Sequence, residues 1–215
     1  MPNFFLIAGP NGVGKSTKCK DILPLNCEII DYDYIFSANY RRLDPSVEKW
    51  DKQDVTNAKT IEDIELRKQN AFGKGKDIAI HSNLHPYNHE MVKEFSDKGY
   101  TTNLYFIASD NVEVCKFRVQ QRAYMGEHNV HEAVIEEKYT QGLSNLKQYH
   151  QKFDKTVIFD NTSSKLTRVA KFEKGKLVEL KSHITESLSK KIDFVFKAIQ
   201  EKETQVKKGL NLSSW

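Results

Sequence analysis

The sequence predicts an α/β fold in which a doubly wound sheet of five parallel strands is flanked by helices and followed by a C-terminal β-hairpin and helix. Short apolar runs alternate with helical patterns through about the first 160 residues of the chain, which is typical of parallel sheets with right-handed crossovers. The first apolar run, at residues 4–8, leads directly into a glycine-rich segment at residues 9–17. The expected core therefore spans residues 1–165, and residues 166–215 form the C-terminal part.

The glycine-rich segment matches the pattern Gly-x4-Gly-Lys-Ser of a phosphate-binding loop. Glycines let backbone amides turn inward around an anion, and the helix that follows directs its positive end at the same point. Lys15 adds a mobile charge for the outer phosphates, and Ser16 is the expected ligand of Mg²⁺. The alternative is a glycine-rich turn without a ligand, but the strand before it and Lys-Ser-Thr after it favour the loop. The expected nucleotide-binding residues are Gly9, Pro10, Asn11, Gly12, Val13, Gly14, Lys15, Ser16 and Thr17.

Polar residues follow the next expected strands. Asp31 and Asp33 come after the second strand, and His81, Ser82 and Asn83 come after the third. Because ligands of open parallel sheets bind outside the carboxyl ends of the strands, these side chains are expected on the same side as the loop. The expected later strands are residues 27–30, 77–80, 104–108 and 156–159. The expected helices are residues 17–23, 55–72, 88–98, 112 to about 126, and 131–149.

The sequence after residue 165 has a different pattern. Two strand-like runs, at 168–172 and 176–180, flank Glu173-Lys174-Gly175, which is typical of a β-hairpin. A last helix is expected at about residues 185–207 and should pack on the core. Its apolar stripe consists of Leu188, Ile192, Val195, Phe196 and Ile199.

Composition and charge narrow the classes of partner and the compartment. The chain has 33 basic and 29 acidic residues, a net charge of +4, so we expect neither a nucleic acid nor a membrane as partner. Its three cysteines lack paired or metal-binding spacing, which is typical of a reducing compartment. The first apolar run ends at Gly9, too early for a signal peptide or a membrane span. We therefore expect a cytoplasmic protein.

Several separated segments, in this order along the chain, resemble the zeta-toxin-like P-loop kinases. The segments are residues 6–17, 31–35, 80–85 and 118–146, followed by Asp160-Asn161-Thr162. The resemblance implies a P-loop kinase core with a lid at about residues 112–150, ATP and Mg²⁺ as cofactors, and Asn161 as a nucleotide-binding residue. It also implies transfer of phosphate to a hydroxyl of a small molecule, such as a nucleotide sugar or a related metabolite, and an antitoxin-like protein as a partner to consider.

The resemblance assigns roles to residues at the ends of the strands and in the lid. Asp33 falls at the position of the base that activates the acceptor hydroxyl. Arg118 and Arg122 fall on the Arg-x3-Arg positions of the lid, where two guanidinium groups one helical turn apart reach the triphosphate. Arg122 is the expected transition-state cation. Lys138 replaces an arginine of the family, which keeps the charge and loses the bidentate geometry.

Two further positions depart from the family pattern. Asp31 replaces an asparagine, and two interpretations remain open: an outer ligand of magnesium, or the cap of a helix that begins near Tyr34. His81-Ser82-Asn83 replaces Glu-Thr-Thr on the substrate and metal side of the site. The acceptor therefore depends on His81, which can hydrogen-bond a hydroxyl as the neutral form or pair with an acidic substrate as the cation.

Other functions share parts of this pattern. A non-kinase P-loop ATPase has the same loop, but this chain lacks a Leu-Ser-Gly-Gly signature and an apolar strand that ends in Asp-Glu. A nucleotide-binding module without phosphotransfer is the third hypothesis, and the departures at His81 and Lys138 favour it. A zinc site formed by His81, His85 and His89 is disfavoured, because four-residue spacing needs a continuous helix and Pro86 interrupts it.

Overall fold

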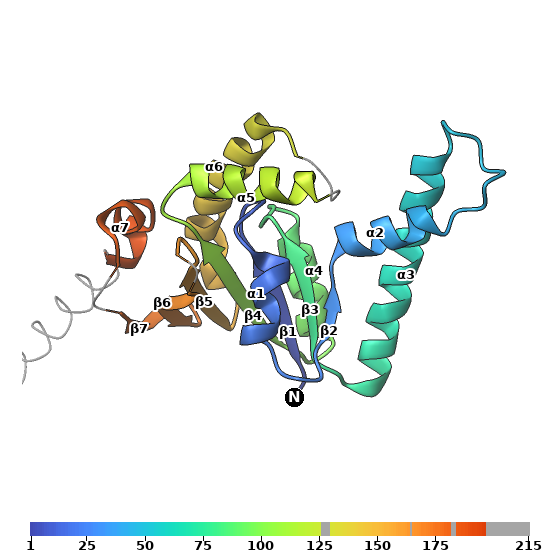
Figure 1. Cartoon of the computed structure of the whole chain (residues 1–215). Helices are drawn as coiled ribbons and strands as arrows, with labels where there is room; N and C mark the ends of the chain where they lie inside the picture. Colours follow the sequence, from blue (N-terminus) through green and yellow to red (C-terminus); the bar gives the residue numbers. More distant parts are fainter. Residues whose placement is uncertain (126–129, 164, 182–183, 197–215) are drawn as a thin grey trace, which may run out of the picture.

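A single mixed sheet organises the molecule (Figure 1). The computed structural model describes residues 1–125, 130–163, 165–181 and 184–196. The strand order is β2-β3-β1-β4-β5-β6-β7. The first five strands are parallel, as predicted, whereas β6 and β7 join the sheet antiparallel, so the C-terminal hairpin continues the sheet. The strands are β1 (Asn3–Ala8), β2 (Glu28–Ile30), β3 (Ile78–Ser82), β4 (Thr101–Ala108), β5 (Lys155–Asp160), β6 (Thr167–Glu173) and β7 (Lys176–Leu180).

Helices connect the strands and cover both faces of the sheet. The helices are α1 (Lys15–Ile22), α2 (Tyr32–Arg41), α3 (Lys52–Lys74), α4 (Asn88–Asp97), α5 (Val112–Tyr124), α6 (Glu132–Tyr149), the 3₁₀ turn η1 (His150–Lys152) and α7 (Glu186–Lys191). The expected helices and strands are present, and β3 extends two residues beyond the expected end, so that it includes His81 and Ser82. The helix near Tyr34 that one interpretation of Asp31 requires is present as α2, but its extent to Arg41 was not predicted.

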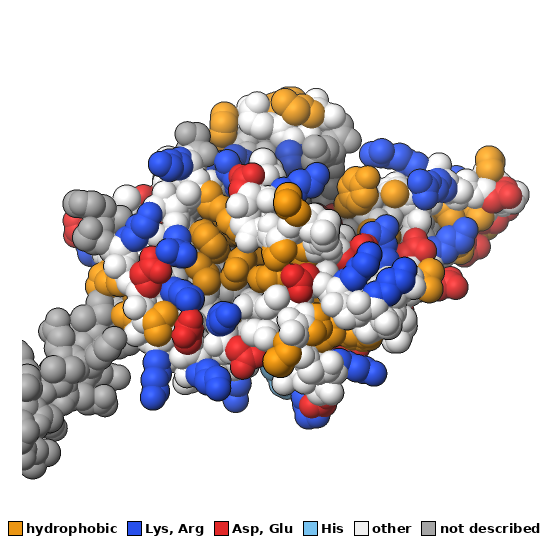
Figure 2. Space-filling view, turned by 90° about the horizontal axis from the view of Figure 1, so that it is seen from below, with side chains coloured by type: hydrophobic (Ala, Val, Ile, Leu, Met, Phe, Trp, Pro, Cys, Tyr) orange, Lys and Arg blue, Asp and Glu red, His pale blue; other side chains and the backbone are white. Residues whose placement is uncertain are grey.

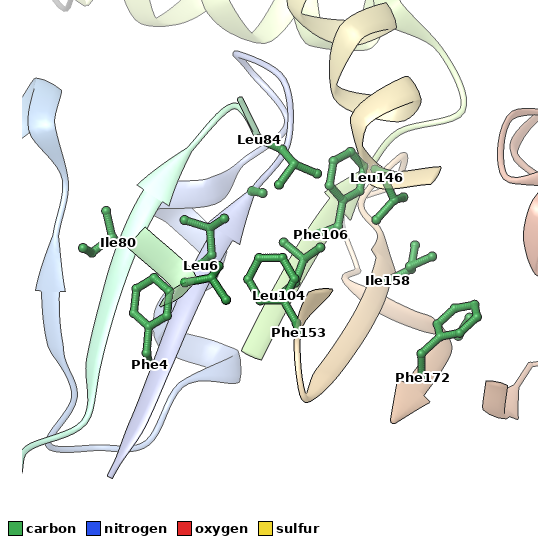
Figure 3. Close-up of a cluster of buried hydrophobic side chains, with 14 of the residues drawn as sticks. Phe4, Leu6, Ile80, Leu84, Leu104, Phe106, Leu146, Phe153, Ile158 and Phe172 are labelled. Atoms are coloured by element: carbon green, nitrogen blue, oxygen red, sulfur yellow. The ribbon is translucent and has the colours of Figure 1, made fainter. Parts of the chain in front are cut away.

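The core has two layers because neighbouring residues of a strand point to opposite faces. Phe4 and Leu6 of β1 belong to the layer that also contains Phe95 of α4 (Figure 3). Phe5 and Ile7 belong to the other layer, with Cys19 of α1 and with Cys115 and Val119 of α5. Helices α5 and α6 bury one apolar face each, which includes Cys115, Val119, Ile135, Tyr139 and Leu146.

Helices α2 and α3 extend beyond the β2 edge of the sheet (Figure 1). Asp31 caps α2, since its side chain accepts a hydrogen bond from the backbone amide of Tyr34. Ile35 is the buried residue of α2. The polar stretch after the second strand thus forms a helical pair beside the carboxyl end of β2.

The C-terminal helix differs from the expectation. Helix α7 ends at Lys191, the backbone of Ile192 leaves the helical conformation, and helical structure resumes at residues 193–196. Leu188, Ile192 and Val195 are buried in the core, as the stripe predicts. Residues 197–207 of the expected helix, with Ile199, lie outside the described residues. The prediction of one continuous helix is therefore wrong within residues 185–196, because the helix is interrupted at Ile192.

A polar contact ties α7 to the sheet side of α6. Lys191 Nζ donates to the hydroxyl of Tyr139 at 2.8 Å and to the backbone carbonyl of Asp110, and it lies 5.0 Å from the ring centroid of Tyr139. Ser187 donates to the same carbonyl. The C-terminal part therefore contacts both the loop after β4 and the helix of the expected lid.

The distribution of charged side chains, the character of the helices and the state of the cysteines complete the description of the fold. On the face seen in Figure 2, basic and acidic side chains are interspersed. Among the described residues, no helix has both the length and the apolar character needed to cross a membrane. The three cysteines are free thiols, and Cys19 and Cys115 are buried.

Candidate active site

A cleft of about 480 Å³ opens where β1, β2 and β3 end. The loop before α1, the start of α2 and the turn after β3 form its walls, and α5 contributes two arginines. The predicted site residues that line it are Pro10, Asn11, Gly12, Gly14, Lys15, Ser16, Thr17, Asp31, Asp33, His81, Ser82, Asn83, Arg118 and Arg122. Gly9, Val13, Lys138 and Asn161 do not line the cleft.

The phosphate-loop backbone takes conformations that require glycine. Gly12 and Gly14 have φ values of 78° and 97°, in the left-handed region. A Cβ atom on Gly12 would lie 2.2 Å from the backbone oxygen of Cys115, and one on Gly9 would lie 2.3 Å from that of Ile107. The loop therefore packs directly on β4 and α5, and a side chain at either position would displace it.

Lys15 turns back over the loop. Its Nζ donates to the carbonyls of Gly9 at 2.7 Å and Pro10 at 3.1 Å, and to Oδ1 of Asn83 at 3.0 Å. Burial lowers the pKa of Lys15 from 10.5 to about 8, although the negative charges of Asp33 and Asp31 oppose this shift. The ammonium thus bridges the donor loop and the turn after β3.

Of the two interpretations of Asp31, the helix cap is confirmed, and the magnesium ligand stays a prediction. Asp31 caps α2, and its Oδ2 accepts a hydrogen bond from Ser16 Oγ at 2.6 Å. Burial opposes ionisation, but hydrogen bonds from His81 and Ser16 hold the pKa of Asp31 well below its usual range. A hydroxyl beside an ionised carboxylate is the oxygen donor set that Mg²⁺ prefers, so Ser16 and Asp31 fit the ion that the loop motif implies.

His81 is paired with Asp31 at the base of the cleft. Its side chain is 6% exposed, and Nδ1 lies 2.8 Å from Asp31 Oδ2. Burial alone would lower the pKa of His81, but the Asp31 carboxylate raises it above the ordinary value. Among the described residues, Nε2 has no hydrogen-bond partner. The pairing with Asp31 therefore favours the cationic form of the imidazole, next to the carboxylate and hydroxyl that fit Mg²⁺.

The histidines do not gather into a metal site. Within the described parts of the chain, no three His, Cys, Asp or Glu side chains come close enough to share an ion. His85 stacks on Tyr87 with ring centroids 5.1 Å apart, and both line the cleft beyond Asn83. Burial lowers the pKa of His85, and the charges of Lys138 and Lys15 lower it further. His85 is therefore a neutral group on the wall opposite the loop.

Asp33 lies in the first turn of α2, at the mouth of the cleft. Its side chain is exposed, and it lies close enough to Lys15 to act on that pKa. The structure thus brings Asp33, Lys15 and Ser16 into the same cleft, and the sequence predicted that they would lie on one side of the sheet.

The two arginines of α5 differ in their contacts. Arg118 donates to the carbonyls of Asn161, Thr162 and Ser163, the segment that follows β5. The Arg122 side chain is half-buried in the cleft, close enough to Lys15 to lower its pKa. Both guanidinium groups face the cleft, but Arg118 also fixes the loop after β5.

Two predicted residues act from outside the cleft. Asn161 is 3% exposed and donates to the carbonyl of Val13 at 2.8 Å, so it supports the phosphate loop from beneath. Its Oδ1 is buried without a hydrogen-bond partner among the described residues. Lys138 lies on α6 near Glu137, and its charge acts on His85 at the far end of the cleft.

The turn after β3 shapes the wall opposite the phosphate loop. Ser82 donates to Asn88 Oδ1 at 2.8 Å and accepts from the amide of Leu84, whose φ is 59°. The cleft also contains Tyr32 and Met91, which sequence reasoning did not select. Tyr32 could have been found from its place between the two aspartates, whereas no local signal marks Met91.

Comparisons with known proteins add evidence on the fold. No family model and no curated protein matches this chain. Among solved structures, a protein of the PezAT chromosomal toxin-antitoxin system of Streptococcus pneumoniae matches with a TM-score of 0.59 and 17% identity, over 94% of this chain and 87% of that one. AvrRxo1-ORF1:AvrRxo1-ORF2 with sulphate ions matches with a TM-score of 0.65 and 14% identity over 89% of this chain.

A structure of AvrRxo1-ORF1:-ORF2 with ATP matches similarly, with a TM-score of 0.64 and 13% identity. The chain spans 63% of the length of the matched AvrRxo1 chain. At these identities the likeness concerns the fold. The chain therefore shares the fold of these proteins, and the resemblance to zeta-toxin-like P-loop kinases that its motifs carry is confirmed at the level of the fold.

Proposed function

We propose that this protein is an ATP- and Mg²⁺-dependent kinase that phosphorylates a hydroxyl of a small molecule. The observation that carries the proposal is the extent of the cleft. The same cleft is lined by the phosphate loop and Asp33 and by Asn83, His85 and Tyr87 after β3. A nucleotide held by the loop leaves the part of the cleft near the turn after β3 for an acceptor, and the Asp33 carboxylate lines the same cleft.

The residues of this cleft suit in-line transfer of a phosphoryl group. Asp33 accepts the proton of the acceptor hydroxyl, whose oxygen bonds to the γ-phosphorus while the bond to the β,γ-bridging oxygen breaks and ADP leaves. Lys15 and Arg122 stabilise the negative charge that develops on the transferred group. Mg²⁺, held by Ser16 with Asp31 beside it, would neutralise charge on the β- and γ-phosphates.

The resemblance indicates which acceptors to test first. They are a nucleotide sugar such as UDP-N-acetylglucosamine and, second, the adenylate ribose of NAD. Both matched systems have two components, a toxin and an antitoxin in one case and ORF1 with ORF2 in the other. We therefore propose an antitoxin-like protein partner as well, and a cytoplasmic location in keeping with the three free thiols.

The test is transfer of label from γ-³²P-ATP to a panel of hydroxylated metabolites in the presence of Mg²⁺. We expect Asp33→Asn to lower kcat by about 10²- to 10⁴-fold and to leave the Kd for ATP within about twofold, since the carboxylate acts on the acceptor. Lys15→Ala should weaken ATP binding. Asp97→Asn is the control, because Asp97 is an exposed carboxylate at the end of α4, paired with Lys93 and outside the cleft.

Two outcomes would contradict the proposal. If ATP binds but no acceptor in a broad metabolite extract takes up label, the chain is a nucleotide-binding module without phosphotransfer. If phosphate is released to water at a rate that acceptors do not change, it is a non-kinase ATPase.

A further inference from the structure

The hydroxyl groups that line the candidate active site differ in their hydrogen bonds. Within the described part of the chain, these groups belong to Ser16, Thr17, Tyr32, Ser82 and Tyr87. Three of them donate to a side-chain oxygen: Ser16 to Asp31 at 2.6 Å, Tyr32 to Asn57 at 2.7 Å and Ser82 to Asn88 at 2.8 Å. The hydroxyls of Thr17 and Tyr87 have no hydrogen-bond partner among the described residues. These two are therefore the hydroxyls that can move without breaking a hydrogen bond.

Thr17 is badly placed to receive a phosphoryl group. It lies in the first turn of α1, next to the lysine and serine of the phosphate loop. In-line transfer requires the attacking oxygen to approach the γ-phosphorus from the side opposite the leaving ADP. The amides of the loop and of the start of α1 are expected to hold the phosphates of that leaving group. Thr17 is therefore on the leaving side, and Tyr87 remains.

Tyr87 lies in the turn after β3, where we propose that the acceptor binds. Its residue is 60% exposed, and its ring stacks on His85 with centroids 5.1 Å apart and planes inclined by 12°. His85 is close enough to Lys15 for the ammonium to lower its pKa. Asn83, in the same turn, accepts a hydrogen bond from Lys15 Nζ at 3.0 Å. The phenol is thus carried by the wall that contacts the lysine of the phosphate loop.

The backbone around Tyr87 is held while its hydroxyl is not. Asn88 Oδ1 accepts from the hydroxyl of Ser82 at 2.8 Å and from the backbone amide of His85 at 2.7 Å. Tyr87 itself is the residue that precedes α4, with a φ of −68° after Pro86. A fixed turn therefore presents an exposed phenol to the cleft, and rotation of one side chain is enough to change where its oxygen lies.

We propose that Tyr87 is a site of autophosphorylation, at which the protein transfers the γ-phosphoryl group of ATP to its own phenol. Oη of Tyr87 bonds to the γ-phosphorus while the bond to the β,γ-bridging oxygen breaks and ADP leaves. The phenolic proton passes to the carboxylate of Asp33, which lines the same cleft. This inference rests on the proposed kinase function and adds an acceptor that belongs to the chain itself.

The test is incubation of the full chain with γ-³²P-ATP and Mg²⁺ in the absence of any other acceptor. Intact-mass measurement and peptide mass spectrometry then locate the label. We expect a single phosphate on each chain, carried by Tyr87. Because the transfer occurs within one chain, its rate constant should not depend on protein concentration. A rate constant that rises in proportion to concentration would contradict transfer within the chain.

Variants separate this site from other labelled positions. Tyr87→Phe keeps the ring and removes the hydroxyl, so labelling should fall by at least about tenfold. Tyr124→Phe is the matched control, since Tyr124 is 87% exposed on α5 and does not line the cleft. It should be labelled as the wild type is. Asp33→Asn should slow labelling by about 10²- to 10⁴-fold. Lys15→Ala should abolish it, which excludes a contaminating kinase.

The proposal is overturned if the wild type transfers label to a small molecule but gains none on Tyr87, or if Tyr87→Phe is labelled as fast as the wild type. Label on Tyr87 without transfer to any small molecule would refute the small-molecule kinase alone. Absence of every transfer while ATP stays bound would refute both.

Discussion

The Nδ1 atom of His81 lies 2.8 Å from Oδ2 of Asp31, the same oxygen that accepts the hydrogen bond from Ser16. Three elements, α1, the start of α2 and β3, are thus joined through one carboxylate oxygen. The other oxygen of Asp31 accepts from the amide of Tyr34 and starts α2. At position 81 the family resemblance implies an acidic residue, but this chain has His81, which pairs with the carboxylate of Asp31.

Replacement of His81 by leucine should destabilise the protein at low pH more than at high pH. The pKa of His81 is raised in the folded state, so the pair stabilises fully below about pH 6.5, and this stabilisation is lost as the pH rises through the raised pKa. We expect His81→Leu to lower the free energy of unfolding by about 1–3 kcal/mol at pH 6. Urea denaturation at pH 6 and pH 9 measures it. His89→Leu, at an exposed position, is the control. An equal loss at both pH values would contradict the pairing.

Affinity for ATP should fall as Lys15 loses its proton. Because the pKa of Lys15 is about 8, the charged fraction decreases by about tenfold between pH 7 and pH 9, and the Kd should rise by about the same factor. Titration calorimetry over this range measures the change. In Lys15→Arg the side chain keeps its charge, so its Kd should be nearly constant whatever its absolute value. A parallel slope in both proteins would assign the pH dependence to another group.

Gly12→Ala should disrupt the phosphate loop. The added methyl group would lie 2.2 Å from the carbonyl of Cys115, and the φ of 78° is unfavourable for alanine. We expect the free energy of unfolding to fall by at least about 2 kcal/mol, with loss of ATP binding. The matched control is Gly73→Ala in α3, where nothing lies within 4 Å of the added atom. That variant should gain about 0.5–1 kcal/mol. Thermal melts compare the two, and similar melting temperatures would contradict the contact.

Lys191→Met should loosen the C-terminal part. The substitution removes the hydrogen bonds to Tyr139 and to the carbonyl of Asp110, together with the cation–π contact. We expect a loss of about 1–2 kcal/mol in the free energy of unfolding. The neighbouring Lys190 is 73% exposed and pairs with Glu186, so Lys190→Met should change stability by less than about 0.5 kcal/mol. Equal effects of the two substitutions would show that the contact with α6 contributes nothing.

The parallel sheet could be predicted because its information is local. Each strand is a short apolar run, each is followed by a polar or glycine-rich turn, and the glycine-rich loop identifies the first crossover. The extent of helix α2, which was only one of two interpretations around Asp31, could not be predicted for the opposite reason. Its sequence, Tyr32 to Arg41, contains aromatic and polar residues of modest helix propensity and a single buried side chain, Ile35. The cap at Asp31 and the packing on α3 stabilise it, and only the tertiary structure brings α3 there.

For the candidate site too, the sequence predicts which residues come together but not which atoms they contact. Strand ends converge in a parallel sheet, so the gathering of Asp33, His81 and Lys15 at one edge follows from the order of strands and loops. The hydrogen-bond partners of the site residues do not follow from that order. Lys15 contacts Asn83 across 68 positions of sequence, and Arg118 reaches carbonyls that follow β5. Those pairings depend on how helices are placed above the sheet. The catalytic roles of these residues stay predictions.

One contact links the phosphate loop to the opposite wall of the cleft. Lys15 Nζ donates to Asn83 Oδ1, which belongs to the turn after β3, where we propose that the acceptor binds. When the ammonium instead binds the phosphates of ATP, the amide of Asn83 loses its donor and can accept a hydrogen bond from the second substrate. We therefore expect the enzyme to follow a compulsory order, with nucleotide entering before acceptor, and initial-rate kinetics with a dead-end nucleotide analogue should show it.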